Sequence, residues 1–130
     1  MFKNLNIRAL GFRLPFQRAV EAAKIGGFQG VDIDIVEMKT TLKSKPIDEV
    51  KDFVEENGLK LGGWVLPVNF RRDGETYRRD LEELPDYAEI AEELGCRRVF
   101  TWILSFSDEL SFDENFGFHV NRLRPVAEIL

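Results

Sequence analysis

The chain has 130 residues, 44% of them hydrophobic and 32% charged, so we expect a globular protein with an apolar interior. Its net charge of -5 disfavours nucleic acid as a partner, because phosphate binding requires a basic surface. A single cysteine excludes an internal disulfide, and no stretch reaches the ~18 apolar residues of a membrane span. Residues 1–10 lack the apolar core of a signal peptide, so we expect a cytoplasmic protein without nucleic-acid or membrane partners.

A short apolar run followed by an amphipathic helix recurs four times along the chain. The strands are expected at residues 5–10, 30–36, 59–66 and 97–104. The helices are expected to begin at Pro15, after Pro46, near Tyr77 and after Asp113, and the first three to end before Gly26, Gly58 and Gly95. Strands that alternate with helices indicate a parallel sheet with right-handed crossovers. The one-sided apolar stripes predict strand order 1-2-3-4 with all the helices on one side.

The helical spacing of apolar residues in the last expected helix continues up to the final residue, Leu130. No glycine or polar residue follows to end that helix, although an evolved domain usually closes its last helix. We therefore expect residues 1–130 to form a single domain that is truncated after its fourth βα unit. Whether such a piece is natural or engineered is left open.

The second expected strand, in the segment GVDIDIV, contains two aspartates among aliphatic residues. Because side chains alternate along a strand, Val31, Ile33 and Ile35 share one face. Asp32 and Asp34 share the other. If helices cover the aliphatic face, the aspartates point toward the inside of a barrel, where an unpaired carboxylate is costly to bury.

We expect different roles for the two aspartates. Asp34 is nearer the carboxyl end of the strand and is the better candidate for contact with a ligand. Asp32 is the candidate for an internal hydrogen bond or ion pair. The alternative is a purely structural pair that is satisfied by Arg8 or Lys60 and by buried water.

Three segments carry a resemblance to a known family: GGFQGVDIDI (26–35), NGLKLGGWVLP (57–67) and LGCRRVFTWIL (94–104). In order and spacing they resemble the sugar phosphate isomerase/epimerase family, the xylose-isomerase-like TIM barrels, over essentially all 130 residues. The resemblance implies an α/β fold, with this chain as (βα)₄, the N-terminal half of the family's (β/α)₈ barrel.

The resemblance implies aldose–ketose isomerisation or epimerisation of a small sugar or sugar phosphate. In that chemistry a carboxylate removes a proton next to a carbonyl, while a divalent metal (Mn, Mg, Co or Zn) stabilises the oxyanion. The family holds its metal with two glutamates, an aspartate and a histidine, mostly beyond the position of Leu130. We therefore expect this chain alone to hold no metal and to be inactive or very weak, with its catalytic residues unknown. The one histidine, His119, lacks a second histidine at ligand spacing, so we expect it to serve helix packing or the surface.

Residues near the ends of the four strands are candidates for a substrate pocket, because TIM-barrel sites gather there. They are Arg8, Phe12, Asp34, Trp64, Asn69, Thr101 and Trp102. Each tryptophan can stack on a sugar ring or equally fill the barrel core. Gly62 and Gly63 would let a neighbour approach Trp64 closely. Cys96 is expected to be a small buried residue rather than a nucleophile.

Two alternatives to an isomerase half remain. A non-catalytic half-barrel could bind a small sugar-like ligand or associate with itself, since two copies would pair their open strand edges in an eight-stranded homodimer. A flavodoxin-like open sheet, such as a receiver domain, has a similar length. Receivers need acidic residues after strand one and an aspartate after strand three, where this chain has IRALGF and GGWVLPV.

Overall fold

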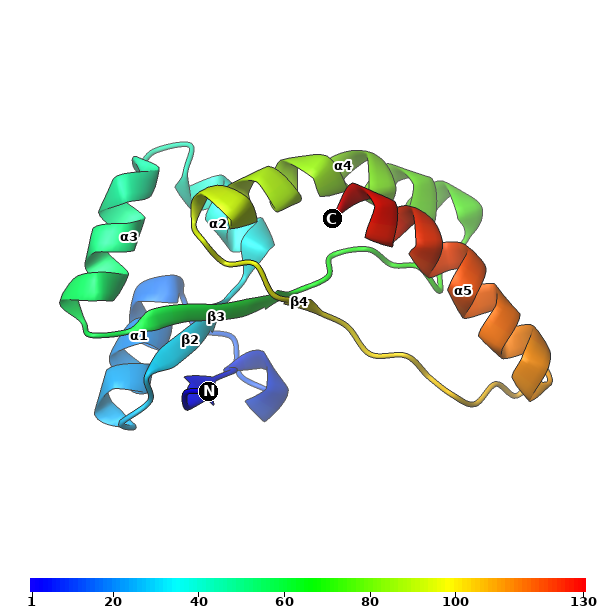
Figure 1. Cartoon of the computed structure of the whole chain (residues 1–130), viewed down its shortest axis with the longest axis horizontal. Helices are drawn as coiled ribbons and strands as arrows, with labels where there is room; N and C mark the ends of the chain where they lie inside the picture. The colour runs from blue at the N-terminus through cyan, green and yellow to red at the C-terminus, as the bar shows by residue number, and fades with distance from the viewer. The chain divides into compact units, whose positions relative to one another are not determined.

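Four parallel strands form one sheet in the order β1-β2-β3-β4, as a computed structural model of residues 1–130 shows (Figure 1). The strands are β1 (Asn4–Leu5), β2 (Gly30–Ile33), β3 (Lys60–Val65) and β4 (Val99–Phe100). The helices are α1 (Phe16–Ile25), α2 (Ile35–Thr41), α3 (Ile47–Glu56), α4 (Gly74–Glu93) and α5 (Phe112–Ile129), with a 3₁₀ turn at η1 (Arg8–Leu10). The predicted α/β class and strand order are confirmed. None of the helices combines the length and the apolar character that crossing a membrane requires.

The chain divides into two compact units. The first contains Met1–Val65 and Ile90–Phe100, and therefore the whole sheet. The second contains Leu66–Glu89 and Thr101–Leu130. Helix α4 contributes residues to both units.

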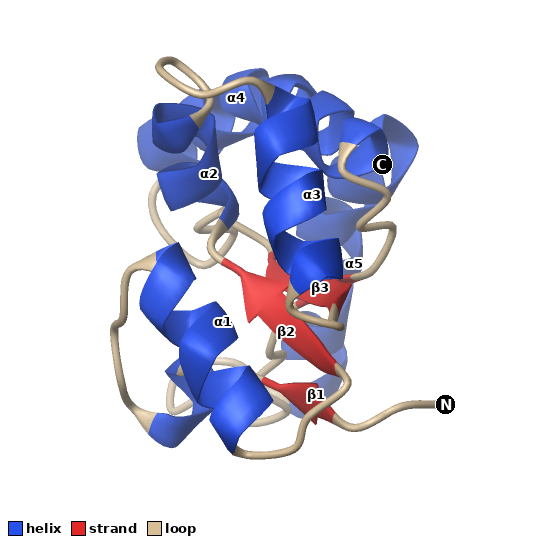
Figure 2. Ribbon diagram, turned by 90° about the vertical axis from the view of Figure 1, so that its left-hand side faces the viewer, coloured by secondary structure: helices blue, strands red, loops and turns tan.

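In the first unit, α1 and α3 cover one face of the sheet (Figure 2). The rings of Phe16 in α1 and Phe53 in α3 meet edge to face, with centroids 6.3 Å apart. Val31 and Ile33 of β2 are almost fully buried, whereas Asp32 between them is partly exposed. The predicted alternation is therefore confirmed for residues 31–33, and α1 and α3 lie on the same side as predicted.

Strand β2 ends at Ile33, so the prediction of a strand through residue 36 is wrong. Asp34 is the N-cap of α2, where its Oδ1 accepts hydrogen bonds from the backbone N–H groups of Val36 (3.2 Å) and Glu37 (3.3 Å). This cap supplies an acceptor for backbone N–H groups that have no partner in the first turn of a helix. It therefore favours a helix after Ile33 over continuation of the strand. Ile35 is buried as predicted, but from a helix that the sequence pattern did not reveal.

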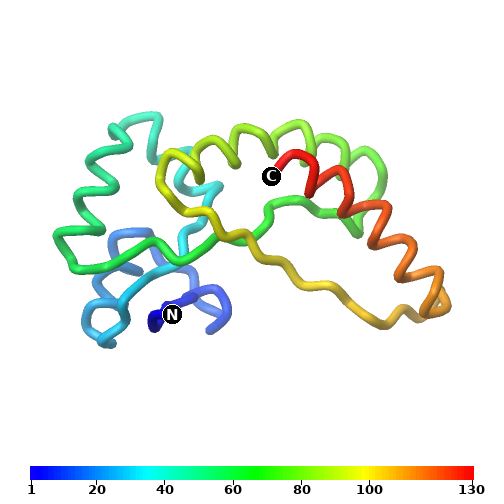
Figure 3. Tube along the Cα trace, viewed as in Figure 1, coloured from blue at the N-terminus to red at the C-terminus, as the bar shows by residue number.

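The first and last strands are also shorter than predicted. After β1, the side-chain oxygen of Asn6 accepts from the Ala9 backbone N–H at 2.8 Å, and the C-cap of η1 is Gly11, whose φ of 81° suits glycine. Strand β4 ends at Phe100, and Figure 3 shows the extended stretch of chain between it and α5. Residues 6–10 and 101–104 therefore lie outside the sheet.

In the second unit, Tyr77 of α4 contacts α5, where its hydroxyl donates to the Arg122 carbonyl at 2.7 Å. Helix α5 begins at Phe112, two residues earlier than an Asp113 cap would place it, because Ser111 and Glu114 form a capping box. Pro85 lies inside α4 without splitting it into two helices. His119 is buried in α5, with its Nδ1 2.8 Å from the Asn115 carbonyl oxygen, which fits the expected packing role.

Candidate functional site

A cavity of about 380 Å³ opens in the first unit at the carboxyl ends of the strands. Asn6 and Ile7 border it just after β1, and Asp34 just after β2. Val65 and Phe100, the last residues of β3 and β4, also line it. The carboxyl ends of parallel strands are where sites occur in barrels of this type.

Arg8 and Asp34 form an ion pair at this cavity. The Arg8 Nη2 atom lies 2.5 Å from Asp34 Oδ2, and the side chains are 46% and 25% exposed. Asp34 therefore binds the guanidinium with one oxygen and caps α2 with the other. The alternative in which Arg8 is a partner of the aspartates is therefore correct for Asp34. This ion pair still leaves both side chains in contact with a ligand in the cavity, because both of them line it.

Glu37 also lines the cavity and binds the start of α1. Its Oε1 accepts a hydrogen bond from the Phe16 backbone N–H at 3.0 Å. Pro15 precedes this residue as the N-cap and offers no side-chain acceptor, so the carboxylate of Glu37 replaces a conventional cap. The start of α1 thus depends on a side chain from α2.

Asp32 occupies a different environment from Asp34. Its Oδ1 accepts from Asn4 Nδ2 at 2.6 Å, which agrees with the internal hydrogen bond expected for it. Burial raises the pKa of Asp32 above its ordinary value, although hydrogen bonds from Asn4 and the Gly63 backbone and the charge of Arg98 oppose that shift.

A second hollow of about 270 Å³ adjoins Asp32 on the same face of the sheet. Asn4, Gly62, Gly63 and Arg98 contribute to its wall. A Cβ atom at Gly62 would overlap the Asn4 side chain, and one at Gly63 would lie 2.9 Å from the Arg98 carbonyl oxygen. The two glycines therefore admit the Asn4 side chain and the Arg98 carbonyl, and that carbonyl accepts from the Trp64 backbone N–H at 2.9 Å, so a backbone neighbour does approach Trp64 closely.

Trp64 is a core residue and does not line either cavity, which corrects its assignment to the pocket. It is 2% exposed, and its Nε1 donates to the Cys96 carbonyl oxygen at 3.1 Å. Of the two roles open to this tryptophan, the structure shows the filling of the core. Cys96 is itself buried, and burial raises the pKa of its thiol to about 11, so the thiolate needed for nucleophilic chemistry is disfavoured.

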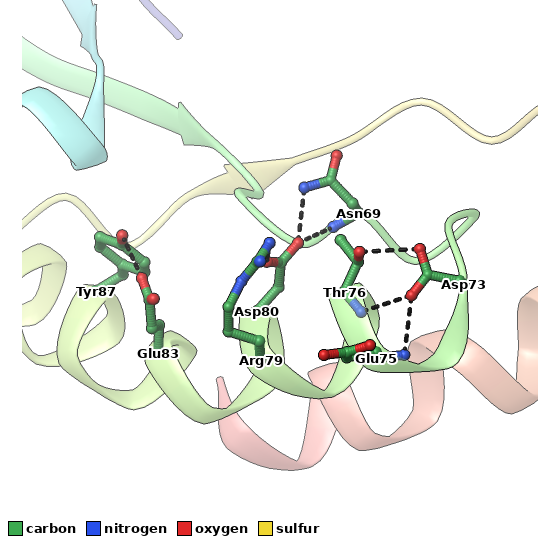
Figure 4. Close-up of polar contacts among 8 residues, drawn as sticks. All are labelled: Asn69, Asp73, Glu75, Thr76, Arg79, Asp80, Glu83 and Tyr87. Carbon is green, nitrogen blue, oxygen red and sulfur yellow. Dashed lines mark hydrogen bonds and ion pairs between the residues drawn. The ribbon is translucent and has the colours of Figure 1, made fainter.

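The remaining candidates lie in the second unit. The backbone N–H and the side-chain amide of Asn69 both donate to Asp80 Oδ2, at 2.9 and 2.6 Å (Figure 4). Asn69 therefore fixes the loop before α4 to that helix. Thr101 and Trp102 follow β4, and Trp102 is 55% exposed. Of the predicted residues, the cavity of the first unit brings together Arg8, Phe12 and Asp34.

Besides Asp32, four polar residues at the two hollows were missing from the predicted set: Asn4, Asn6, Arg13 and Arg98. The sequence did hold a signal for the asparagines, since they flank the buried Leu5 and share one face of an extended segment. Arg13 and Arg98 had no such signal. Arg13 lies on the loop before α1, and Arg98 lies just before β4.

The residues of this chain do not fit a divalent metal site. No group of three or more histidine, cysteine, aspartate or glutamate side chains is arranged to hold an ion. The cavity carboxylates of Asp34 and Glu37 are already bound to Arg8 and to helix N–H groups. No catalytic step through a metal can therefore be assigned to these residues.

Two solved structures are similar to this chain. A xylose isomerase domain protein from Alicyclobacillus acidocaldarius subsp. acidocaldarius superposes with a TM-score of 0.69 and 24% identity, over 91% of this chain and 42% of that one. The fold is that of half a xylose-isomerase-like TIM barrel. D-psicose 3-epimerase from Clostridium cellulolyticum H10, solved with D-tagatose, superposes with a TM-score of 0.62 and 15% identity, over 90% of this chain and 43% of that one.

The chain thus spans less than half the length of either similar structure. Searches of protein-family models and of curated proteins found no match. The half-barrel fold predicted from the sequence is confirmed, and the flavodoxin-like alternative is not supported.

Proposed function

We propose that this chain forms one wall of the substrate site of a sugar isomerase or epimerase. The observation that carries the proposal is the cavity at the carboxyl ends of all four strands, where Arg8, Asp34 and Asn6 offer both donors and acceptors. Hydroxyl groups of a sugar both donate and accept, so a mixed lining of this kind suits them. The two similar structures, a xylose isomerase domain protein and an epimerase solved with D-tagatose, support this choice of substrate.

In this proposal the residues of the cavity bind and orient the sugar. Arg8, fixed by Asp34, donates from its remaining N–H groups to ring or hydroxyl oxygens. Phe12 is 62% exposed at the cavity, and its ring packs against the C–H face of the sugar. Orientation of this kind contributes to catalysis by placing the reacting carbon next to groups that move its proton.

The proton transfer itself would need groups that this chain does not arrange. The proposed reaction is proton abstraction next to a carbonyl, which in a metal-assisted form requires a divalent ion and a base. We assign both to residues outside this chain. The chain alone is then a binding wall with little or no activity.

Titration of the purified chain with D-tagatose, followed by the backbone amide signals in NMR, tests the proposal. We expect saturable shifts at Ala9, Phe16 and Glu37, and at least about tenfold weaker binding for Arg8→Ala. Arg18→Ala is the matched control, because Arg18 lies on α1 outside the cavity and is 69% exposed. Equal affinity of both variants, or no saturable shift in the parent chain, contradicts the proposal.

A second candidate function, self-association of a non-catalytic half-barrel, is favoured by an apolar segment in the second unit. Residues 102–116 carry exposed large apolar side chains at Trp102, Ile103, Leu104, Phe106, Phe112 and Phe116. Such a patch often marks a protein interface. Two copies would supply the eight strands of a closed barrel.

Sedimentation equilibrium distinguishes the second candidate from a monomeric wall. A homodimer has twice the 15.0 kDa mass of one chain. Phe106→Asp should then dissociate it, whereas Ile25→Asp, at an exposed apolar residue outside the segment, should not. A monomer at all concentrations excludes this candidate.

A further inference from the structure

The cavity of the first unit contains the chemical features that usually bind a phosphate. These are the Arg8 guanidinium and the backbone N–H groups at the starts of α1 and α2. A sugar phosphate would be expected to place its anionic group against such donors. Whether the donors are available decides which class of sugar fits.

The Arg8 guanidinium and the start of α2 are both engaged by Asp34. One oxygen of this carboxylate binds Arg8 Nη2, and the other accepts from the N–H groups of Val36 and Glu37. A phosphate would have to displace the carboxylate or share these donors with it. Two anions that share one cation repel each other, so this arrangement disfavours a second one.

The start of α1 is engaged in the same way by Glu37. Its carboxylate accepts from the Phe16 N–H, the donor that a phosphate would otherwise approach. The two carboxylates that occupy these donors, those of Asp34 and Glu37, come from the cap and the first turn of α2. The chain therefore fills each anion site of the cavity with an acid of its own.

The overall charge of the cavity lining also disfavours an anionic ligand. Three carboxyl groups, those of Asp32, Asp34 and Glu37, line the cavity together with two guanidinium groups, those of Arg8 and Arg13. Arg13 is exposed on the loop before α1, where water and salt screen its charge. An anionic substrate thus meets a lining in which acids outnumber bases.

We propose that the cavity selects neutral, polyhydroxylated sugars and rejects sugar phosphates. This inference rests on the proposed function and deepens it by naming the substrate class. Neutral hydroxyls can donate to Asp34 and Glu37 without displacing them from their partners, because each carboxylate has further lone pairs. A phosphate, with no proton to donate in its fully ionised form, cannot.

A titration with inorganic phosphate tests the inference. The purified chain and its variants are titrated at constant ionic strength, and the same backbone amide signals are followed in NMR. We expect no saturable phosphate binding by the parent chain. Asp34→Asn and Glu37→Gln should each bind phosphate at least about tenfold more tightly, because each removes a negative charge from the lining and keeps the side-chain shape. Asparagine also caps helices well, so Asp34→Asn should stay folded.

Glu55→Gln is the matched control, since it makes the same charge change at an exposed position of α3 outside the cavity. It should bind phosphate as weakly as the parent chain. Saturable phosphate binding by the parent chain, or no gain in the two cavity variants, would overturn the inference. A direct comparison of D-tagatose with D-tagatose 6-phosphate should favour the neutral sugar, and preference for the phosphate would also overturn it.

The outcomes separate this inference from the proposed function. If the parent chain binds D-tagatose 6-phosphate better than D-tagatose, the sugar site stands and the selection for neutral sugars fails. If neither sugar binds, the proposed function fails, while the phosphate series on the three variants still decides whether the carboxylates exclude anions.

Discussion

Asp32 and Asp34 are two residues apart and have different electrostatic surroundings. Asp34 binds a guanidinium and caps a helix, so both of its oxygens meet positive donors. Asp32 is held mainly by the neutral amide of Asn4 and is partly buried. The cost of desolvation therefore dominates at Asp32, and its pKa is raised above 3.8.

The raised pKa of Asp32 predicts how its replacement depends on pH. The folded state holds the Asp32 proton to higher pH than the unfolded chain does. The stability that this difference provides is fully present below the unfolded pKa of about 3.9 and is lost as pH rises through the folded pKa. Because asparagine does not titrate, the stability of Asp32→Asn relative to the parent chain should increase as pH rises from about 3 to neutral.

Urea unfolding of both proteins across that pH range measures this difference directly. The other carboxyl groups are common to the two proteins, so their contributions cancel. A difference in unfolding free energy that stays constant with pH would contradict a raised pKa at Asp32.

Asn69 is predicted to matter for stability rather than for ligand binding. Asp80 is 9% exposed and accepts two hydrogen bonds from Asn69, of which alanine would keep only the one from the backbone N–H. Because loss of a hydrogen bond to a buried charged group costs about 1.5–3 kcal/mol, Asn69→Ala should lower the unfolding free energy by that amount at neutral pH. Burial raises the pKa of Asp80, but hydrogen bonds from Asn69 and Arg79 outweigh it and leave that pKa lowered.

The stability linked to Asp80 is present above its unfolded pKa and is lost as pH falls through the folded one. The deficit of Asn69→Ala should therefore shrink in acid. Asn121→Ala, at an exposed position of α5, is the control and should change stability by less than about 0.5 kcal/mol. A similar effect of the two substitutions would show that the bond to Asp80 contributes nothing.

Side-chain caps decide where several helices of this protein begin. Asp34 starts α2, and Asp73 accepts from the N–H groups of Glu75 and Thr76 at the start of α4 (Figure 4). In α5, the Ser111 side chain accepts from the Glu114 N–H, while the Glu114 carboxylate accepts from the Ser111 N–H at 2.9 Å. These contacts set helix boundaries that apolar spacing alone does not define.

Ser111→Ala should therefore destabilise the protein by about 1 kcal/mol, because it leaves a helix N–H group without its acceptor. Thermal unfolding followed by circular dichroism measures the effect, and amide hydrogen exchange at residues 113–115 should become faster. Ser105→Ala lies in the exposed stretch before α5 and serves as the control. Equal melting temperatures of the two variants would contradict the capping role.

At the scale of the whole molecule, four strands form a sheet with two edges, at β1 and β4. Each edge strand pairs with one neighbour, although the closed barrels of this fold pair every strand on both sides. The two similar structures are more than twice as long as the part of them that this chain matches. A complete substrate site in such a barrel draws on loops from more strands than these four.

The chain alone should therefore show no measurable isomerase or epimerase turnover with D-tagatose, with or without added Mn²⁺, Mg²⁺, Co²⁺ or Zn²⁺. The physical reason is that its residues form no group of three metal-binding side chains. Detection of the product sugar by chromatography after long incubation is the measurement. Turnover that rises with added metal and disappears with a chelator would refute this prediction.

Local spacing of apolar residues was enough to determine the order of the four strands and of the four longer helices α1, α3, α4 and α5. The stripe of α1 and the alternation of Val31, Asp32 and Ile33 are properties of neighbouring residues, so they can be read without knowledge of distant contacts. The parallel order then follows from the alternation of strands with helices. The resemblance of three segments to a barrel family added the half-barrel architecture, which the two similar structures confirm.

Only the tertiary structure decided the ends of the strands and the composition of the cavity. Arg8 meets Asp34 across 26 residues of sequence, and Glu37 reaches the start of α1 from 21 residues away. Such pairs depend on the register between β1 and β2 and on the unpredicted helix α2, neither of which leaves a periodic trace in the sequence. Trp64 was ambiguous for the same reason, because a strand places it on one face and only packing against Cys96 shows that this face is buried.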